Sequence, residues 1–343
     1  MRTIPSTTFR VRGFLRLFAA TLLLALLFSF PAAGATKLTV YTAVEPELLS
    51  RYANDFTAQN PDISIVWVRD SAGPIGARLL AEKDAPRADV VFGLALSSLL
   101  PLAEHGILEA YTPKGIEHLS PGTYDKANPP LWIGINTWGS AICVNTRELA
   151  RKNLPEPQSW KDLTDPKYKD VIATASPVTS STMYMNVSAW IQNMGEQQAW
   201  EYMDALHPNI KMYTHSGCKP AQMAAQGEIP IALASAACAQ PYIERKAPIK
   251  LIIPTEGTGW DLEASALIKN GKNKEAAQKL LDFCTSMEVA RVAQEKAYIP
   301  VRSDALTDET RTAQAAFLPG DPLKSAAMRR EVLEKWRARF ESR

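Results

Sequence analysis

A run of four hydroxyl residues, Thr179 to Thr182, stands where the sequence predicts that a helix begins. It follows the strand-like segment 171–174 and precedes an apolar stretch with helical spacing. The first N–H groups of a helix lack partners within the helix and lie at the positive end of its dipole. Together with hydroxyl donors they can bind a phosphate-like group. Ordinary capping is the alternative, because Ser and Thr are favoured at helix starts, and the run alone leaves both interpretations open.

Small, hydroxyl and glycine residues also follow the other predicted strands. In open α/β sheets, ligands bind beyond the carboxyl ends of the strands, so these positions are considered together. Each taken singly is explained by capping, but their recurrence in both halves favours a cleft built from helix N-termini. The positions are 41–45, 70–73, 93–95, 176–182, 214–217, 235–237 and 257–263.

Acidic and aromatic residues stand beside the same strand ends. A site for an anion alone would not benefit from the carboxylates of Glu45, Asp261 and Glu263. A ligand with a phosphonate at one end and an ammonium at the other could use them, with Trp260 and Tyr41 supplying cation–π faces. The alternatives are helix-dipole compensation for Glu45 and a solvated turn for Asp261.

No catalytic motif is present. The sequence lacks G-x-S-x-G, H-E-x-x-H and a phosphate-loop lysine. His105, His118, His207 and His215 are scattered without metal-ligand spacing, and no cysteines form CxxC. We therefore expect no enzymatic activity, no bound metal and no cofactor.

Residues 1–35 are predicted to be a cleaved signal peptide, because a basic start and an apolar run precede a small-residue site. Its removal leaves 34 basic and 36 acidic residues, a net charge of −2. No basic cluster remains, which argues against nucleic-acid binding. We expect an exported, monomeric protein in the periplasm.

Four cysteines remain after cleavage. In an oxidising compartment Cys218 and Cys238 are close enough in sequence to bridge one helix–strand unit, and this pair is the candidate disulfide. Four free thiols are the alternative. Cys143 and Cys284 lie in apolar runs and are expected to pack as small hydrophobic residues.

Strands and helices alternate in units of about 25 to 30 residues, which predicts parallel βαβ packing. The 308 residues after the signal peptide are enough for two lobes. Strands are expected at 37–41, 63–68, 88–92, 139–145, 171–174, 229–234, 249–253 and 262–268.

Several segments together resemble the periplasmic solute-binding proteins of bacterial ABC importers. They are LTVYTAVEPELLSRYANDFTAQNP, DSAGPIGARLLAEK, ADVVFGLA, THSGCKPAQMAAQGE and ALIKNGKNKEAAQKLLDF. The resemblance covers nearly all of residues 37–300, in the branch that includes ferric-iron binders and 2-aminoethylphosphonate binders. Ferric-iron binders generally use two adjacent tyrosines, whereas the corresponding stretch 235–242 has a lone Tyr242. SPVTSSTMYMNVS and GTGWDLEASALIKNG look like the 2-aminoethylphosphonate-binding group.

The resemblance implies an α/β, type II-like periplasmic binding fold with two mostly parallel sheets joined by crossover strands. Lobe 1 would comprise 36–138 and 263–343, and lobe 2 would comprise 139–262. A phosphonate, 2-aminoethylphosphonate first, would bind in the cleft, and a membrane permease would recognise the closed protein. The alternatives are a receptor for ferric iron or for another oxyanion or organophosphate, and an exported hydrolase.

The resemblance also assigns the ligand contacts. The residues expected at the phosphonate are Ser71, Thr179, Ser180, Ser181 and Thr182, with Thr42 and Ser216 in support. Those expected at the amine follow from the acidic and aromatic residues at the strand ends, and they are Tyr41, Glu45, Trp260, Asp261 and Glu263.

Overall fold

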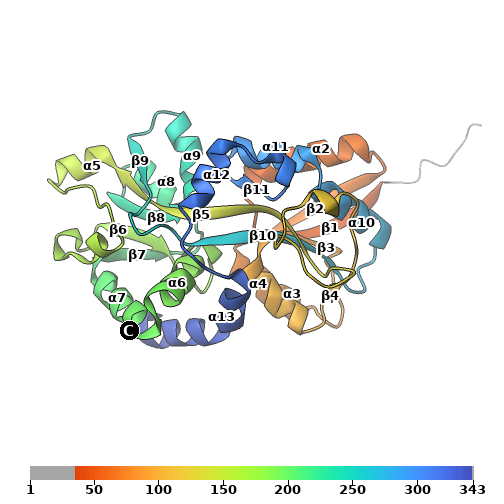
Figure 1. Cartoon of the computed structure of the whole chain (residues 1–343), viewed down its shortest axis with the longest axis horizontal. Helices are drawn as coiled ribbons and strands as arrows, with labels where there is room; N and C mark the ends of the chain where they lie inside the picture. The colour runs from red at the N-terminus through yellow and green to blue at the C-terminus, as the bar shows by residue number, and fades with distance from the viewer. Residues whose placement is uncertain (1–34, 342–343) are drawn as a thin grey trace, which may run out of the picture. The chain divides into compact units, whose positions relative to one another are not determined.

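The computed structural model describes residues 35–341, and these form two α/β lobes (Figure 1). The predicted signal peptide, residues 1–35, lies outside the described residues apart from Ala35. The strand order is β2-β1-β3-β10-β5-β8-β6-β7, with β4 beside β10 and with β9 and β11 beside β5. The two-lobed α/β fold predicted from the sequence is confirmed.

The first lobe is built on β1, which pairs in parallel with both β2 and β3. Helices alternate with these strands, and α2 buries Leu48, Leu49, Tyr52 and Phe56, which recur at helical spacing. The elements are β1 (Thr36–Thr42), α2 (Pro46–Gln59), β2 (Ile63–Arg69), α3 (Ala72–Ala81), β3 (Val90–Ala95), α4 (Leu96–Glu104) and β4 (Leu108–Glu109).

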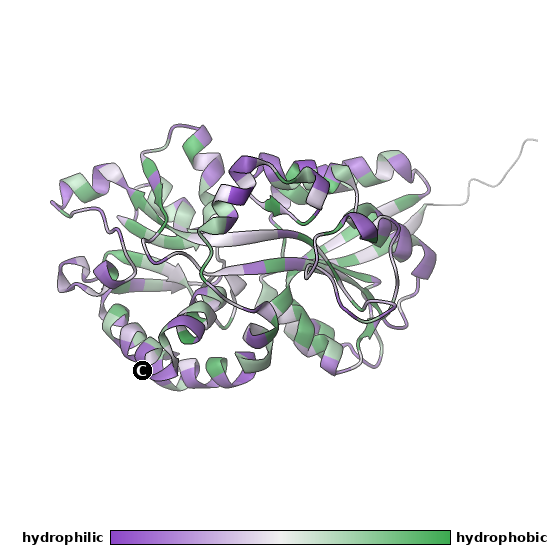
Figure 2. Cartoon of the chain, in the orientation of Figure 1, coloured by the Kyte–Doolittle hydropathy of each residue, from purple (hydrophilic) through white to green (hydrophobic). Residues whose placement is uncertain are grey.

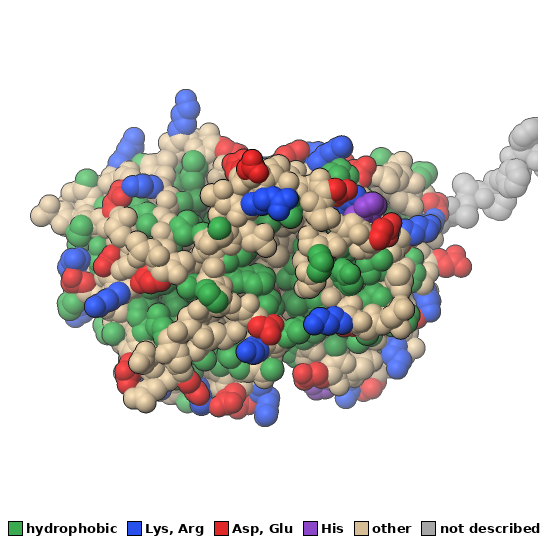
Figure 3. Space-filling view, viewed as in Figure 1, with side chains coloured by type: hydrophobic (Ala, Val, Ile, Leu, Met, Phe, Trp, Pro, Cys, Tyr) green, Lys and Arg blue, Asp and Glu red, His purple; other side chains and the backbone are tan. Residues whose placement is uncertain are grey.

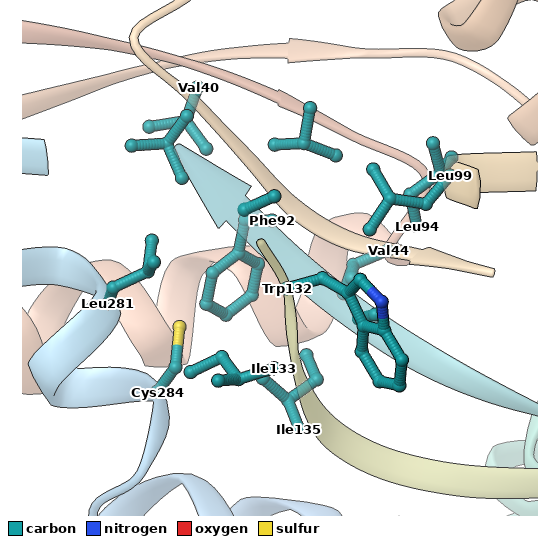
Figure 4. Close-up of a cluster of buried hydrophobic side chains, with 14 of the residues drawn as sticks. Val40, Val44, Phe92, Leu94, Leu99, Trp132, Ile133, Ile135, Leu281 and Cys284 are labelled. Carbon is teal, nitrogen blue, oxygen red and sulfur yellow. The ribbon is translucent and has the colours of Figure 1, made fainter. Parts of the chain in front are cut away.

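The core of this lobe draws on residues from both ends of the chain. Phe92 of β3 lies among Ile133, Leu281 and Cys284, which belong to later segments (Figure 4). Burying each such aliphatic or aromatic side chain contributes about 1.5 to 3 kcal/mol. The first lobe is therefore completed only after the chain returns from the second lobe.

The second lobe has parallel pairs of β6 with β7 and with β8. In α6 the side chains of Met183, Tyr184, Val187 and Trp190 are at most 2% exposed, as the apolar spacing predicts. The elements are α5 (Thr146–Arg151), β6 (Ile172–Ala175), α6 (Ser181–Met194), α7 (Glu196–Leu206), β7 (Ile210–Thr214), α8 (Lys219–Ala225), β8 (Ile231–Ser235), α9 (Ala236–Glu244) and β9 (Ile249–Ile252).

Two strands cross between the lobes. The first part of β5 (Ile133–Asn145) pairs with β10 (Trp260–Ile268), and its second part pairs with β8 and β9. In turn, β10 also pairs with β3. All of these pairings are antiparallel. Because β5 pairs with strands of both lobes, it passes between them, and β10 runs beside it back into the first lobe as the sequence analysis predicts.

The C-terminal part of the chain returns to the first lobe and then reaches the second. Its elements are α10 (Lys274–Cys284), α11 (Met287–Glu295), β11 (Ile299–Pro300), α12 (Asp308–Ala315) and α13 (Pro322–Trp336). The assignment of 263–343 to lobe 1 needs a correction at α13. Val332, Leu333 and Trp336 pack in the core of the second lobe, because the apolar face of α13 is covered there.

Hydrophobic residues concentrate on the strands, while most helices alternate hydrophobic and hydrophilic residues (Figure 2). On the face seen in Figure 3, acidic and basic side chains are interspersed and form no single-sign patch. Among residues 35–341, the structure contains no helix long and apolar enough to cross a membrane.

Candidate functional site

Two adjoining cavities of about 50 Å³ each lie between the lobes, and we call them together the cleft. Both cavities are lined by Ala43, Glu45, Ser181, Thr182 and Cys218. One end of the cleft, the hydroxyl end, adds Arg69, Ser71, Ala72, Ser180, Ser216 and Gly217. The other, the acidic end, adds Gly93, Ala95, Trp138, Ser235, Cys238, Glu263 and Tyr298.

Six helices begin at residues that line the cleft. In five of them the capping side chain accepts no hydrogen bond from its own helix, and Ser180 of α6 is the exception. The N–H groups at such a helix start that have no other partner are donors for a ligand, and the helix dipoles favour a negative one. In α3 this leaves Ala72 N–H, because Gly73 N–H already donates to the carbonyl oxygen of Thr179. The capping residues of α2, α3, α4, α6, α8 and α9 are Glu45, Ser71, Ala95, Ser180, Cys218 and Ser235.

The hydroxyl end brings together residues that are far apart in the sequence. Ser180, Ser181 and Thr182 face it from the second lobe, and Ser71 faces it from the first. At Gly217 an added Cβ would lie 2.3 Å from Thr182 Oγ1 and 2.6 Å from Ser180 Oγ. Only glycine therefore lets the loop after β7 lie so close to these hydroxyl groups.

The run 179–182 both caps α6 and contributes residues to the wall of the cleft. Ser180 Oγ accepts a hydrogen bond from Thr182 N–H at 3.2 Å, which is capping. Ser181 and Thr182 line the cleft next to it. Thr179 is a correction to the predicted contacts, because its hydroxyl donates to the carbonyl oxygen of His215 at 2.8 Å and it lines neither cavity.

Thr42 is a second correction at the predicted anion site. Its side chain is fully buried, and its Oγ1 accepts a hydrogen bond from Val44 N–H at 3.0 Å. It lines neither cavity of the cleft. Thr42 therefore stabilises the turn between β1 and α2.

Arg69, which the sequence analysis overlooked, supplies a cation at the hydroxyl end. Its Nη2 donates to Glu45 Oε1 at 2.7 Å and its Nε donates to the carbonyl oxygen of Val44 at 3.2 Å. These bonds hold the guanidinium at the cleft, where it can bind a phosphate in a bidentate manner. The sequence feature that could have identified Arg69 is its position as the last residue of β2, directly before Asp70 and Ser71.

Two carboxyl groups mark the acidic end. Glu263 Oε2 accepts a hydrogen bond from Asn136 Nδ2 at 2.8 Å, and burial raises the pKa of Glu263 to about 8. Burial also raises the pKa of Glu45, although the nearby charge of Arg69 opposes that shift. Near neutral pH the Glu263 carboxyl group is therefore mostly protonated and can donate a hydrogen bond as well as accept one.

Two further residues at the acidic end carry buried polar atoms without hydrogen-bond partners. The atoms are Nε1 of Trp138 and Oγ of Ser235. An unsatisfied buried donor is costly, and a ligand that supplies an acceptor would relieve the cost. The sequence signal for Ser235 was its position after β8, whereas nothing marked Trp138 within β5.

Three residues expected at the amine lie away from the cleft, which corrects that part of the prediction. Tyr41 is buried and donates to Glu82 Oε2 at 2.8 Å. Trp260 stacks on Phe317, with ring centroids 5.5 Å apart. Asp261 is buried and accepts a hydrogen bond from Ser97 at 2.6 Å.

Residues 86–325 match the family of bacterial extracellular solute-binding proteins. The chain belongs to this family. A protein of Haemophilus influenzae is 30% identical to it over 319 residues, which is 88% of this chain and 89% of that protein. The family places this solute-binding protein among the periplasmic components of ABC transporters.

Solved structures of periplasmic binding proteins share the fold of this solute-binding protein. AfuA from Actinobacillus pleuropneumoniae, solved with fructose 6-phosphate bound, has a TM-score of 0.83 and 29% identity and matches 89% of this chain and 99% of its own. The periplasmic binding protein P5PA has a TM-score of 0.80 and 25% identity and matches 88% of this chain and 99% of its own.

The two lobes of this solute-binding protein touch at the rim of the hydroxyl end. Gly73 N–H donates to the carbonyl oxygen of Thr179 at 3.0 Å, and Asp70 Oδ1 lies 3.1 Å from His215 Nε2. Partial burial would raise the pKa of Asp70, but hydrogen bonds from His215 and from Ser71 N–H outweigh it and lower that pKa. The lobes are therefore held together at this rim by direct hydrogen bonds.

A disulfide between Cys218 and Cys238 borders the cleft, with a Cα–Cα distance of 5.2 Å. It joins the starts of α8 and α9 in this solute-binding protein. Cys143 and Cys284 are free and buried, and burial raises the pKa of each thiol to about 12. Over residues 35–341, no three His, Cys, Asp or Glu side chains are placed to hold a metal ion.

Proposed function

We propose that this solute-binding protein captures a small molecule carrying a phosphate or phosphonate group and presents it to the permease of an ABC importer. The observation that carries the proposal is the convergence of six helix starts on one cleft, five of them without a side-chain cap. Arg69 and the hydroxyls of Ser181 and Thr182 add charged and neutral donors at the same end. Such a set of donors suits a multiply charged oxyanion.

The other end of the ligand, in this proposal, carries hydroxyl groups. Trp138 Nε1 can only donate a hydrogen bond, and the protonated carboxyl of Glu263 can both donate and accept. A ligand hydroxyl satisfies both groups, because it also donates and accepts, whereas an ammonium offers no acceptor to Trp138. AfuA, whose solved structure contains fructose 6-phosphate, supports a phosphorylated sugar as the first compound to test.

A second candidate is 2-aminoethylphosphonate, which the carboxyl groups of Glu45 and Glu263 favour. Its ammonium group would require Glu263 to be ionised. Because burial raises the pKa of Glu263 to about 8, binding of this ligand near neutral pH would release a proton. Binding of a hydroxyl group would leave that proton in place.

Isothermal titration calorimetry on the mature protein tests the proposal. The titrants are fructose 6-phosphate, 2-aminoethylphosphonate, fructose and ferric citrate, each in two buffers that differ in ionisation enthalpy. We expect fructose 6-phosphate to bind with little proton release and fructose to bind at least about 100-fold more weakly, because two or more charge-assisted hydrogen bonds are lost. Binding of ferric citrate alone would contradict the proposal.

The second candidate would be selected if 2-aminoethylphosphonate bound more tightly than fructose 6-phosphate and released close to one proton per ligand.

An exported hydrolase is the remaining alternative. Phosphorus NMR of the bound ligand after prolonged incubation distinguishes it, since a solute-binding protein returns the ligand unchanged. Release of inorganic phosphate at a rate that scales with protein concentration would support the hydrolase.

A further inference from the structure

A second hollow of about 620 Å³ lies between α3, α4 and α13, and we call it the α13 groove. It shares only Ala72 with the residues that line the cleft. Val178, next to the rim contact of Gly73 with Thr179, lines the groove as well. The volume falls within the range of about 300 to 1,000 Å³ that is typical of small-molecule sites.

The wall formed by α3 is apolar and open. A Cβ added to Gly76 would meet no atom within 4 Å, so the helix presents bare backbone to the groove. Leu80, one turn further along, is 37% exposed although it is a large apolar residue. Leu102 and Leu333 continue this surface on α4 and α13. The groove therefore offers contacts to a hydrocarbon body.

Two buried polar side chains line the same groove without complete hydrogen bonding. Arg329 is 8% exposed, and its Nη1 has no partner. Ser98 is 6% exposed, and its Oγ has no partner. A buried guanidinium nitrogen and a buried hydroxyl without acceptors are each costly. A hydrogen-bond acceptor brought to either atom would satisfy that atom.

The buried cation of the groove, Arg329, favours an anion. Arg329, Arg330 and Arg337 line it, against Glu104 and Glu334. Arg330 Nη1 lies 3.9 Å from Glu334 Oε1, but both side chains are largely exposed, and such a pair is worth little. The basic side chains lie on one side, on α13 and the turn after it, and the open apolar surface lies on α3.

We propose that the α13 groove binds a small amphiphilic anion, with a single carboxylate head and a short hydrocarbon body. The carboxylate would accept hydrogen bonds from Arg329 and Ser98, and the hydrocarbon body would lie along Gly76 and Leu80. This site is separate from the cleft, so the proposal does not depend on which ligand the cleft binds.

Titration calorimetry with octanoate, kept below its micelle concentration, tests the proposal on the mature protein. We expect one site per chain with a dissociation constant in the millimolar range or tighter. Octylammonium and butyrate are the matched probes, since one lacks the anionic head and the other lacks most of the hydrocarbon body. Each should bind at least about tenfold more weakly than octanoate.

The variant Gly76→Leu places a side chain in the groove, where the added Cβ meets no atom within 4 Å, and it should weaken octanoate binding at least about tenfold. Ser50→Leu adds a leucine to an exposed position of α2 and is the matched control, with octanoate binding unchanged. Arg329→Gln removes the charge but risks misfolding, so Ser98→Ala, which breaks no hydrogen bond, provides the second test of the head-group contact. No binding of octanoate, equal binding of octylammonium, or full binding by Gly76→Leu would each overturn the proposal.

Discussion

The two ends of the cleft differ in how their polar groups are satisfied. At the hydroxyl end, Ser180 caps α6 and Arg69 is held by Glu45, so both have partners before a ligand arrives. At the acidic end, Trp138 Nε1 and Ser235 Oγ have none, and Glu263 is mostly protonated near neutral pH. The ligand that we propose matches this difference, with its charged group at the hydroxyl end and its neutral hydrogen-bonding groups at the acidic end.

The variant Arg69→Met is expected to have the largest effect on the hydroxyl end. It removes the guanidinium and its bidentate contact with the oxyanion, so binding of fructose 6-phosphate should weaken by about 2 to 4 kcal/mol. Titration calorimetry measures the change. Arg51→Met, which removes an exposed pair with Asp55 outside the cleft, is the control with unchanged affinity. Equal affinities for the two variants would mean that Arg69 does not contact the ligand.

Ser181→Ala should weaken binding by about 1.5 to 3 kcal/mol if its hydroxyl donates to a charged oxygen. Thr179→Val is the matched variant, because it removes a neighbouring hydroxyl that bonds to His215 and lies outside the cleft. Its affinity should stay close to that of the natural protein. If Thr179→Val weakened binding and Ser181→Ala did not, Thr179 would be the ligand contact and Ser181 would only begin the helix.

Glu263→Gln should change the pH dependence of stability. In the folded state burial raises the pKa of Glu263 to about 8 from an ordinary value of 4.5, so the folded protein retains a proton that the unfolded chain loses. Between these pH values the free energy of unfolding falls as the pH rises, by up to about 1.4 kcal/mol per pH unit. The variant lacks this fall. Urea unfolding at several pH values checks the prediction, and identical slopes for both proteins would contradict it.

Ser235→Ala is expected to have the smallest effect. Loss of its hydroxyl should weaken ligand binding by about 1 kcal/mol. The stability of the free protein should not fall, since Ser235 Oγ has no partner to lose. Ser97→Ala is the comparison, because it breaks a buried bond to Asp261 and should lower stability while leaving affinity unchanged. Thermal unfolding and calorimetry on both variants would reveal whether the two effects separate in this way.

The sequence predicted the positions of most strands and the gathering of small and hydroxyl residues at their ends. The alternation of strands with helices predicts this gathering, because the carboxyl ends of parallel strands meet at the same edge of a sheet. It could not show that Thr179 and Ser181, two residues apart in one turn, point to different surroundings. Which of the two hydroxyl groups faces the cleft depends on the loop that carries His215, because its carbonyl oxygen accepts the hydrogen bond of Thr179.

The acidic end was harder to predict for a related reason. Asp261 and Glu263 both follow a turn and both are buried, but Ser97 covers the first while the second faces the cleft. Their difference arises from Ser97 of α4, which bonds to Asp261 and not to Glu263, and the local sequence pattern does not show this contact. Arg69 was overlooked because its place at the cleft depends on a contact with Glu45, which lies 24 residues earlier in the sequence.

In the proposed complex, the oxyanion of the ligand sits against the starts of α3 and α6. A crystal structure of the mature protein with fructose 6-phosphate tests it most directly. We predict that the phosphate oxygens lie within hydrogen-bonding distance of Arg69, of the hydroxyl and N–H groups of Ser181, and of the N–H group of Ala72 at the start of α3. A phosphate bound beside Glu263, or outside the cleft, would contradict this account.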